Sequence, residues 1–169
     1  SELFRHIGSD TDVPAGDIGV GGREVGFMAG MMKKLSNRAD CVFTGKGLSF
    51  GGSLMRPEAT GYGTVYFAQE VLKHAGRSLD GMRVSVSGSG NVAQFAVEKA
   101  MSQGAKVVTV SDSSGTIVDE AGFTPEKLAI LAEVKNHLYA RLDEYARRTN
   151  VTFLPGAKPW HVPVQVALP

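Results

Sequence analysis

The sequence has almost no net charge and no long apolar run. Its 169 residues carry 18 lysines and arginines against 17 aspartates and glutamates, which gives a formal net charge of +1. Proteins that bind nucleic acid or an anionic membrane surface present an excess of basic residues, so we expect neither partner and favour a small-molecule ligand. No apolar run approaches the roughly 18 to 20 residues of a membrane span, and the first residues lack the pattern of a signal peptide.

Cysteine is also scarce. Cys41 is the only one and cannot form an internal disulfide, which fits a reducing compartment, so we expect a soluble, cytoplasmic protein. No histidine or aspartate motif accompanies Cys41, and a small buried hydrophobe is a better interpretation of it than a nucleophile. The sequence has no metal-ligand pattern, and no metal ion is expected. With 43% hydrophobic residues, the chain has enough apolar side chains for a sizeable core.

One segment carries a clear nucleotide-binding pattern. A β-rich run ends at Ser87, a G-x-G-x-x-A motif follows, a helix-like stretch runs to Met101, and a second apolar run ends at the acid Asp112. The first glycine permits a sharp turn, the second lets a pyrophosphate approach the backbone, and the alanine lets the helix pack closely. Free N–H groups at the helix start then face the phosphates. The predicted cradle consists of Gly88, Ser89, Gly90, Asn91, Val92 and Ala93. The alternative is a glycine-rich turn without a ligand.

Strand and helix patterns alternate along the rest of the chain. Helices are predicted over 23–37, 57–74, 91–103 and 125–136, the last resuming toward 147. Strands are predicted over 41–44, 83–87, 106–111, 151–154 and 164–167, with a small hairpin arm at 117–118. This order predicts an α/β fold with a Rossmann-like parallel sheet of about three or four strands, one half of a dinucleotide-binding fold. Both ends of the chain look cut, as expected for a fragment.

Three segments together resemble a known family. They are Asp12-Val-Pro-Ala-Gly-Asp17-Ile-Gly-Val-Gly, Arg56-Pro-Glu-Ala-Thr60-Gly-Tyr62-Gly and Ser87-Gly-Ser-Gly-Asn91-Val-Ala. In this order they resemble the hexameric bacterial glutamate dehydrogenases of the NADP-preferring kind, within the glutamate/leucine/phenylalanine/valine dehydrogenase family. The match runs through essentially the whole chain.

This resemblance implies reversible oxidative deamination of L-glutamate to 2-oxoglutarate and ammonia, with hydride transfer to NADP, in a homohexamer. It also implies that residues 1–55 are the C-terminal part of an α/β substrate and assembly domain. Residues 56–169 would be the first half of the NAD(P)-binding domain, and the active-site lysines would lie N-terminal to Ser1. We therefore expect a central fragment that does not catalyse the reaction alone.

The resemblance also implies site residues. Asp17 matches the catalytic aspartate that carries a proton to and from the substrate amine, although the residues alone leave Asp10, Asp12 and Asp17 equally suited to capping a loop. Arg56 and Thr60 match positions near the substrate and the nicotinamide. An exposed arginine and a threonine without a ligand are the alternative.

The cofactor preference is less direct. An acid at the end of the second strand, here Asp112, usually accepts hydrogen bonds from the adenosine ribose and repels a 2′-phosphate, which favours NAD. The hydroxyls of Ser113 and Ser114, together with Lys135, which matches a lysine of NADP-preferring relatives, favour NADP. Lys135 as a solvated helix charge is the alternative, and Asn91 suits either a phosphate contact or a helix cap. NADP is the predicted cofactor and NAD the second choice.

Two other functions remain open. The chain suits a nucleotide-binding module without catalysis, or part of a sister enzyme that acts on leucine, phenylalanine or valine. The run from Asp12 onward favours glutamate.

Overall fold

The protein divides into two compact units. A computed structural model describes all of residues 1–169, with one unit formed by Ser1–Arg56 and the other by Pro57–Pro169. None of the helices combines the length and the apolar character that crossing a membrane requires.

The first unit is built around one helix. Helix α1 (Gly22–Ser36) begins where the Glu24 carboxylate accepts the Gly21 N–H at 2.9 Å, and short 3₁₀ turns η1 (Glu2–Arg5) and η2 (Leu48–Phe50) complete the unit. Its small core consists of Val25, Ala29 and Phe43. The predicted strand over 41–44 is wrong. That segment places Phe43 in the core, and with no strand of this unit beside it, it cannot form a sheet.

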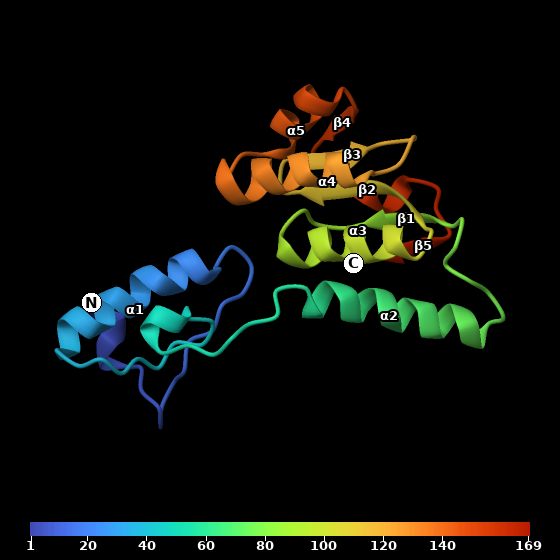
Figure 1. Ribbon diagram of the computed structural model, residues 1–169. Helices are drawn as coiled ribbons and strands as arrows, with labels where there is room; N and C mark the ends of the chain where they lie inside the picture. Colours follow the sequence, from blue (N-terminus) through green and yellow to red (C-terminus); the bar gives the residue numbers. More distant parts are fainter. The chain divides into compact units, whose positions relative to one another are not determined.

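The second unit is a five-stranded sheet with helices packed on it (Figure 1). Along the chain its helices are α2 (Ala59–His74), α3 (Asn91–Ser102), α4 (Pro125–Ala132) and α5 (Leu142–Thr149), with a π-helical turn η3 (Glu133–His137) and a 3₁₀ turn η4 (Pro159–His161). The strands are β1 (Arg83–Val86), β2 (Lys106–Asp112), β3 (Gly115–Val118), β4 (Thr152–Pro155) and β5 (Val166–Leu168). They lie in the order β4-β3-β2-β1-β5.

The predicted α/β class is confirmed, but the sheet is mixed rather than wholly parallel. Strands β5, β1 and β2 are parallel neighbours, whereas β3 runs antiparallel to both β2 and β4. The reason is the two-residue connection from Asp112 to Gly115, since a connection this short can join only antiparallel neighbours. Four strands therefore share one direction, and β3 is the hairpin arm expected around residues 117–118.

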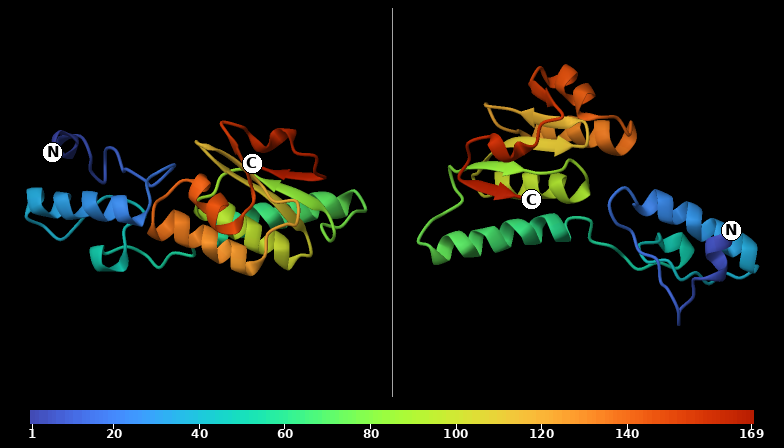
Figure 2. Two further views of the ribbon diagram at one scale, coloured as in Figure 1. Left: turned by 90° about the horizontal axis from the view of Figure 1, so that it is seen from above. Right: turned by 180° about the vertical axis from the view of Figure 1, so that it is seen from behind.

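The core of the second unit lies between the sheet and its helices. Helix α3 packs on β1 and β2, α2 packs on α3, and α5 packs on β3 and β4, an arrangement that the two views of Figure 2 allow the reader to follow. Strand β1 is buried along Val84, Ser85 and Val86, as expected of a central parallel strand. Phe123 stacks on the fully buried ring of Tyr145, with ring centroids 5.9 Å apart.

A threonine hydroxyl compensates for an irregularity in the pairing of β1 with β2. The pairing register of β1 and β2 shifts between Val84 and Ser85. The buried Thr109 hydroxyl accepts the Val86 N–H at 3.1 Å and donates to the Val86 carbonyl at 3.3 Å. It thereby satisfies backbone groups just before the glycine-rich turn.

Thr109→Val should therefore destabilise the protein by about 1–3 kcal/mol, because the buried Val86 N–H loses its partner while side-chain volume is kept. Thr109→Ser retains the hydroxyl and is the control. Urea denaturation followed by circular dichroism measures both. Equal stability of the valine variant and the wild type would show that this hydroxyl does not matter.

Candidate functional site

The glycine-rich turn lies at the carboxyl edge of the parallel strands. Because β1 and β2 are parallel, their ends meet at the same edge of the sheet. The Gly88 N–H donates to the Ser111 hydroxyl at 3.0 Å, and the Ser111 N–H donates to the Gly88 carbonyl at 2.9 Å. The turn after β1 is thus fixed to the end of β2 by two hydrogen bonds.

The glycines of this turn have separate roles. Gly88 has φ +84°, a left-handed conformation that strains other residues. A Cβ on Gly90 would meet nothing within 4 Å, so this backbone opens onto free space that a side chain would partly fill. Ala93 is buried, and its Cβ would lie 3.6 Å from a Cβ built on Gly88. The turn is compact on its inner side and open on its outer side.

The start of α3 offers unused hydrogen-bond donors. Its N-cap is Gly90, which provides no side-chain cap, and the Gln94 N–H makes the bond to the Gly90 carbonyl at 2.9 Å. The N–H groups of Asn91, Val92 and Ala93 precede that bond and have no carbonyl one turn earlier in the helix. Together with the positive end of the helix dipole, they fit a phosphate group. These residues therefore fit the pyrophosphate of a dinucleotide.

Asn91 ties the start of α3 to the segment before α2. Its side-chain amide donates to the Pro57 carbonyl at 2.8 Å. The sequence predicted either a phosphate contact or a helix cap for Asn91, and it did not predict this contact with Pro57. Thr60 lies in the first turn of α2, is exposed, and its carbonyl accepts the Thr64 hydroxyl at 3.0 Å.

The remaining predicted residues belong to the first unit. Asp17 is exposed, and its carboxylate has no hydrogen-bond or ion-pair partner within that unit. Its carbonyl accepts the Val20 N–H at 2.8 Å in a turn that Gly19 closes with φ +76°. Arg56 is exposed and is the last residue of the unit.

Asp112 is held in place at the end of β2. One carboxylate oxygen accepts the Ser114 N–H at 2.8 Å and the Ser114 hydroxyl, and the other accepts the Lys135 ammonium at 3.0 Å. The two ion-paired side chains are only 10% and 17% exposed. Burial raises the pKa of Asp112, but the hydrogen bonds from Ser114 and the ammonium of Lys135 outweigh it and hold that pKa below its ordinary value. The carboxylate stays ionised and paired.

A second cation that the sequence pattern did not reveal lies beside this pair. The Arg141 guanidinium donates to the Ser113 hydroxyl at 2.5 Å, while Lys135 also donates to the Ala140 carbonyl at 3.0 Å. Turn η3 and the residues after it bring Arg141 back to the end of β2. No motif marks that return in the sequence. One carboxylate therefore lies among two cations and two hydroxyls.

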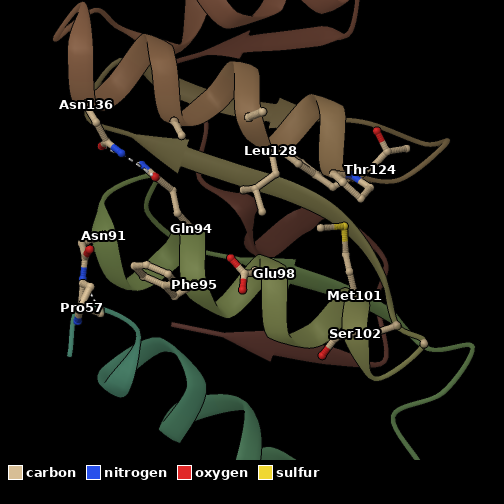
Figure 3. Close-up of a pocket in the computed structure, with 16 residues that line it drawn as sticks. Pro57, Asn91, Gln94, Phe95, Glu98, Met101, Ser102, Thr124, Leu128 and Asn136 are labelled. Carbon is tan, nitrogen blue, oxygen red and sulfur yellow. Dashed lines mark hydrogen bonds between the residues drawn. The ribbon is translucent and has the colours of Figure 1, made fainter.

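A groove of about 980 Å³ runs between α3 and α4 (Figure 3). Apolar side chains such as Phe95, Met101 and Leu128 form much of its wall. At one end, the amides of Gln94 and Asn136 face each other, as Figure 3 shows. Sequence reasoning missed this pair too, because a glutamine and an asparagine 42 positions apart carry no pattern.

A family model described as Glutamate/Leucine/Phenylalanine/Valine dehydrogenase matches residues 51–169. The chain is 70% identical to an NADP-specific glutamate dehydrogenase of Salmonella typhimurium over 169 residues, which are 100% of this chain and 38% of that protein. It is 68% identical to the NADP-specific glutamate dehydrogenase of Escherichia coli (strain K12), with the same coverage. The chain thus spans 38% of the length of these relatives.

Solved structures agree. The glutamate dehydrogenase of Plasmodium falciparum is 47% identical and superimposes with a TM-score of 0.81 over 98% of this chain and 36% of that one. A hetero-hexameric glutamate dehydrogenase from Thermus thermophilus is 26% identical, with a TM-score of 0.69 over 98% of this chain and 38% of that one.

Proposed function

Because the chain belongs to the glutamate/leucine/phenylalanine/valine dehydrogenase family, we propose that it contributes the adenine-nucleotide site and part of the substrate site of an NADP-dependent glutamate dehydrogenase. The reaction is the reversible oxidative deamination of L-glutamate to 2-oxoglutarate and ammonia. The chain spans 38% of its Salmonella relative, so this activity is assigned to the whole protein. The hetero-hexameric relative from Thermus supports a hexameric assembly of the whole protein. We assign the whole protein to the cytoplasm, a reducing compartment that suits the lone cysteine of this chain.

The cofactor is held by two groups of residues. The open N–H groups of Asn91, Val92 and Ala93 bind the pyrophosphate, and the glycines keep the backbone accessible to it. The Ser113 hydroxyl and the cations of Lys135 and Arg141 bind the 2′-phosphate, while Ser114 donates its one hydroxyl hydrogen to Asp112 and holds that carboxylate in place. When bound, NADP supplies the hydride acceptor at C4 of its nicotinamide.

The observation that carries the NADP assignment is the pairing of Asp112. A free carboxylate here would accept hydrogen bonds from the ribose hydroxyls and repel a 2′-phosphate. Instead, Asp112 is bound by Ser114 and Lys135, and Arg141 adds a further positive charge nearby. The local charge therefore favours a phosphate. NAD is the alternative, but it carries no 2′-phosphate, so Arg141 would have no anionic partner when NAD is bound.

The substrate end rests on Asp17, Arg56 and Thr60. We assign Asp17 the transfer of the proton to and from the substrate amine, and Arg56 and Thr60 contacts with the substrate, with Thr60 also near the nicotinamide. The Asp17 carboxylate supports this assignment, because it has no partner within the first unit and therefore does not stabilise that unit through an ion pair or a hydrogen bond.

Titration of the 169-residue chain with NADP⁺ and with NAD⁺ at low salt tests the cofactor assignment. Tighter binding of NADP⁺ is expected. For turnover measurements, residues 1–169 of this chain replace the matching segment of the Salmonella relative in a chimeric enzyme. Equal or tighter binding of NAD⁺ would contradict the assignment.

Lys135→Glu should weaken NADP⁺ binding by about ten- to a hundredfold, because a charge-assisted hydrogen bond is lost and a like charge is introduced. Binding of NAD⁺ should change far less. Lys135→Met removes the cation without adding a carboxylate beside Asp112 and should act in the same direction. Lys158→Glu makes the same change in net charge at an exposed residue and is the control. Unchanged NADP⁺ affinity in both Lys135 variants would refute the role of this lysine.

A further inference from the structure

The amides of Gln94 and Asn136 make a reciprocal pair between α3 and η3. The Gln94 amide nitrogen donates to the Asn136 side-chain oxygen at 3.2 Å, and the Asn136 nitrogen donates to the Gln94 oxygen at 2.9 Å. Gln94 is only 8% exposed, so its polar atoms need partners inside the protein. The pair supplies them on one side.

The other side of Gln94 faces the phosphate cradle. The same amide nitrogen donates to the carbonyl of Ser89 at 2.9 Å, and Ser89 is the residue between the two glycines of the turn. The orientation of the N–H groups that meet a phosphate depends on the conformation of this turn. Gln94 therefore holds the conformation of the glycine-rich turn through the Ser89 carbonyl.

Asn136 is the neighbour of Lys135. Both lie on η3, whose π-helical hydrogen bond runs from the Leu138 N–H to the Glu133 carbonyl at 3.1 Å. A π-helical turn is a rare geometry that often occurs at functional sites, and a side-chain tie helps to hold it. The position of Asn136 fixes where the Lys135 side chain leaves the backbone.

From these contacts we propose that Gln94 and Asn136 are positioning residues that couple the pyrophosphate end of the cofactor site to its 2′-phosphate end. The amide pair joins the Ser89 carbonyl to η3. One arrangement of the pair therefore determines both the conformation of the glycine-rich turn and the position of Lys135. The proposal rests on the NADP assignment above. It predicts that a substitution of Gln94 changes the affinity for a ligand at the 2′-phosphate end, and that a substitution of Asn136 changes the affinity for a ligand at the pyrophosphate end.

Two small ligands separate the ends. ADP carries a pyrophosphate but no 2′-phosphate, and adenosine 2′-monophosphate carries only the 2′-phosphate. Each is titrated calorimetrically into the wild-type 169-residue chain, Gln94→Met, Asn136→Ala and the double variant, after a first titration with NADP⁺ and NAD⁺. Circular dichroism melting of each variant sets a temperature at which all are folded.

Each single substitution should weaken both ligands by about three- to tenfold, because it removes the hydrogen bonds that hold the turn and η3 in position without removing a direct contact to either ligand. The crosswise effects, Asn136→Ala on ADP and Gln94→Met on adenosine 2′-monophosphate, are the signature of coupling. The double variant should be no weaker than the weaker-binding single variant, because both changes break one unit. Since Asn136 is exposed, its alanine variant keeps the core intact and carries the test if Gln94→Met lowers stability.

Another amide pair, which joins α2 to the C-cap residue of α3, is the matched control. The Gln69 amide donates to the Gln103 side-chain oxygen at 2.6 Å, at the far end of α3 from the cradle. Gln103→Met should leave both affinities unchanged.

Other outcomes overturn the proposal. Effects confined to the nearer ligand, strictly additive effects, or lower melting temperatures with unchanged affinities would show that the amide pair is merely structural. Failure of the NADP assignment is visible separately, in the wild-type chain, as NAD⁺ binding at least as tight as NADP⁺. A wild-type chain that binds neither small ligand would overturn both.

Discussion

Replacing Asp17 with asparagine is expected to lower the turnover number of the chimeric enzyme by about a hundredfold to ten-thousandfold, the usual contribution of a general acid–base group. An amide cannot take a proton from the substrate amine at neutral pH or return it. The KM for glutamate should change much less, because the amide keeps the shape of the carboxylate.

The structure makes this a clean test. The Asp17 carboxylate has no partner within its unit, and the turn it sits in is held by backbone atoms and by Gly19. The melting temperature should therefore stay the same. Asp12→Asn alters another exposed carboxylate of the same loop and should leave turnover unchanged. Comparable losses in both variants would remove Asp17 from the reaction and indicate a general effect of loop charge.

The sequence predicts the βαβ core of the second unit because the glycine-rich motif is local. A turn that needs Gly88 in a left-handed conformation, a helix start without a side-chain cap, and two strongly apolar strands are each encoded within a few residues. Their order along the chain then fixes a parallel βαβ unit. The carboxyl edge of β1 and β2 follows without further information.

Features that depend on distant residues were not accessible in this way. The segment around Phe43 has the apolar pattern of a strand, but its unit provides no strand to pair with it. Arg141 and Asn136 reach the site only because η3 and the residues after it redirect the chain, and neither residue type carries a pattern. The pairing of Asp112 with Lys135 shows the same limit, because an acid at this position favours NAD until its partner is known.

The close contact of α2 and α3 also depends on one residue, Gly61, and gives the largest expected change in stability. A Cβ at this position would lie 2.6 Å from the Val92 carbonyl oxygen and 2.8 Å from the Ala96 nitrogen. Both are backbone atoms of α3 and cannot move aside as the end of a flexible side chain can. Gly61→Ala should therefore destabilise the second unit by about 3 kcal/mol or more, at the upper end of the cost of overpacking.

Gly63, two residues further along α2, is the matched control. A Cβ there would meet nothing within 4 Å, so Gly63→Ala should stabilise the protein by about 1 kcal/mol through helix propensity alone. Denaturation in urea, followed by circular dichroism, compares the two variants with the wild type. Opposite signs are expected because the same substitution, in the same helix, meets a backbone at one position and open space at the other. If both alanines stabilised the protein, α2 would not need to approach α3 this closely at Gly61.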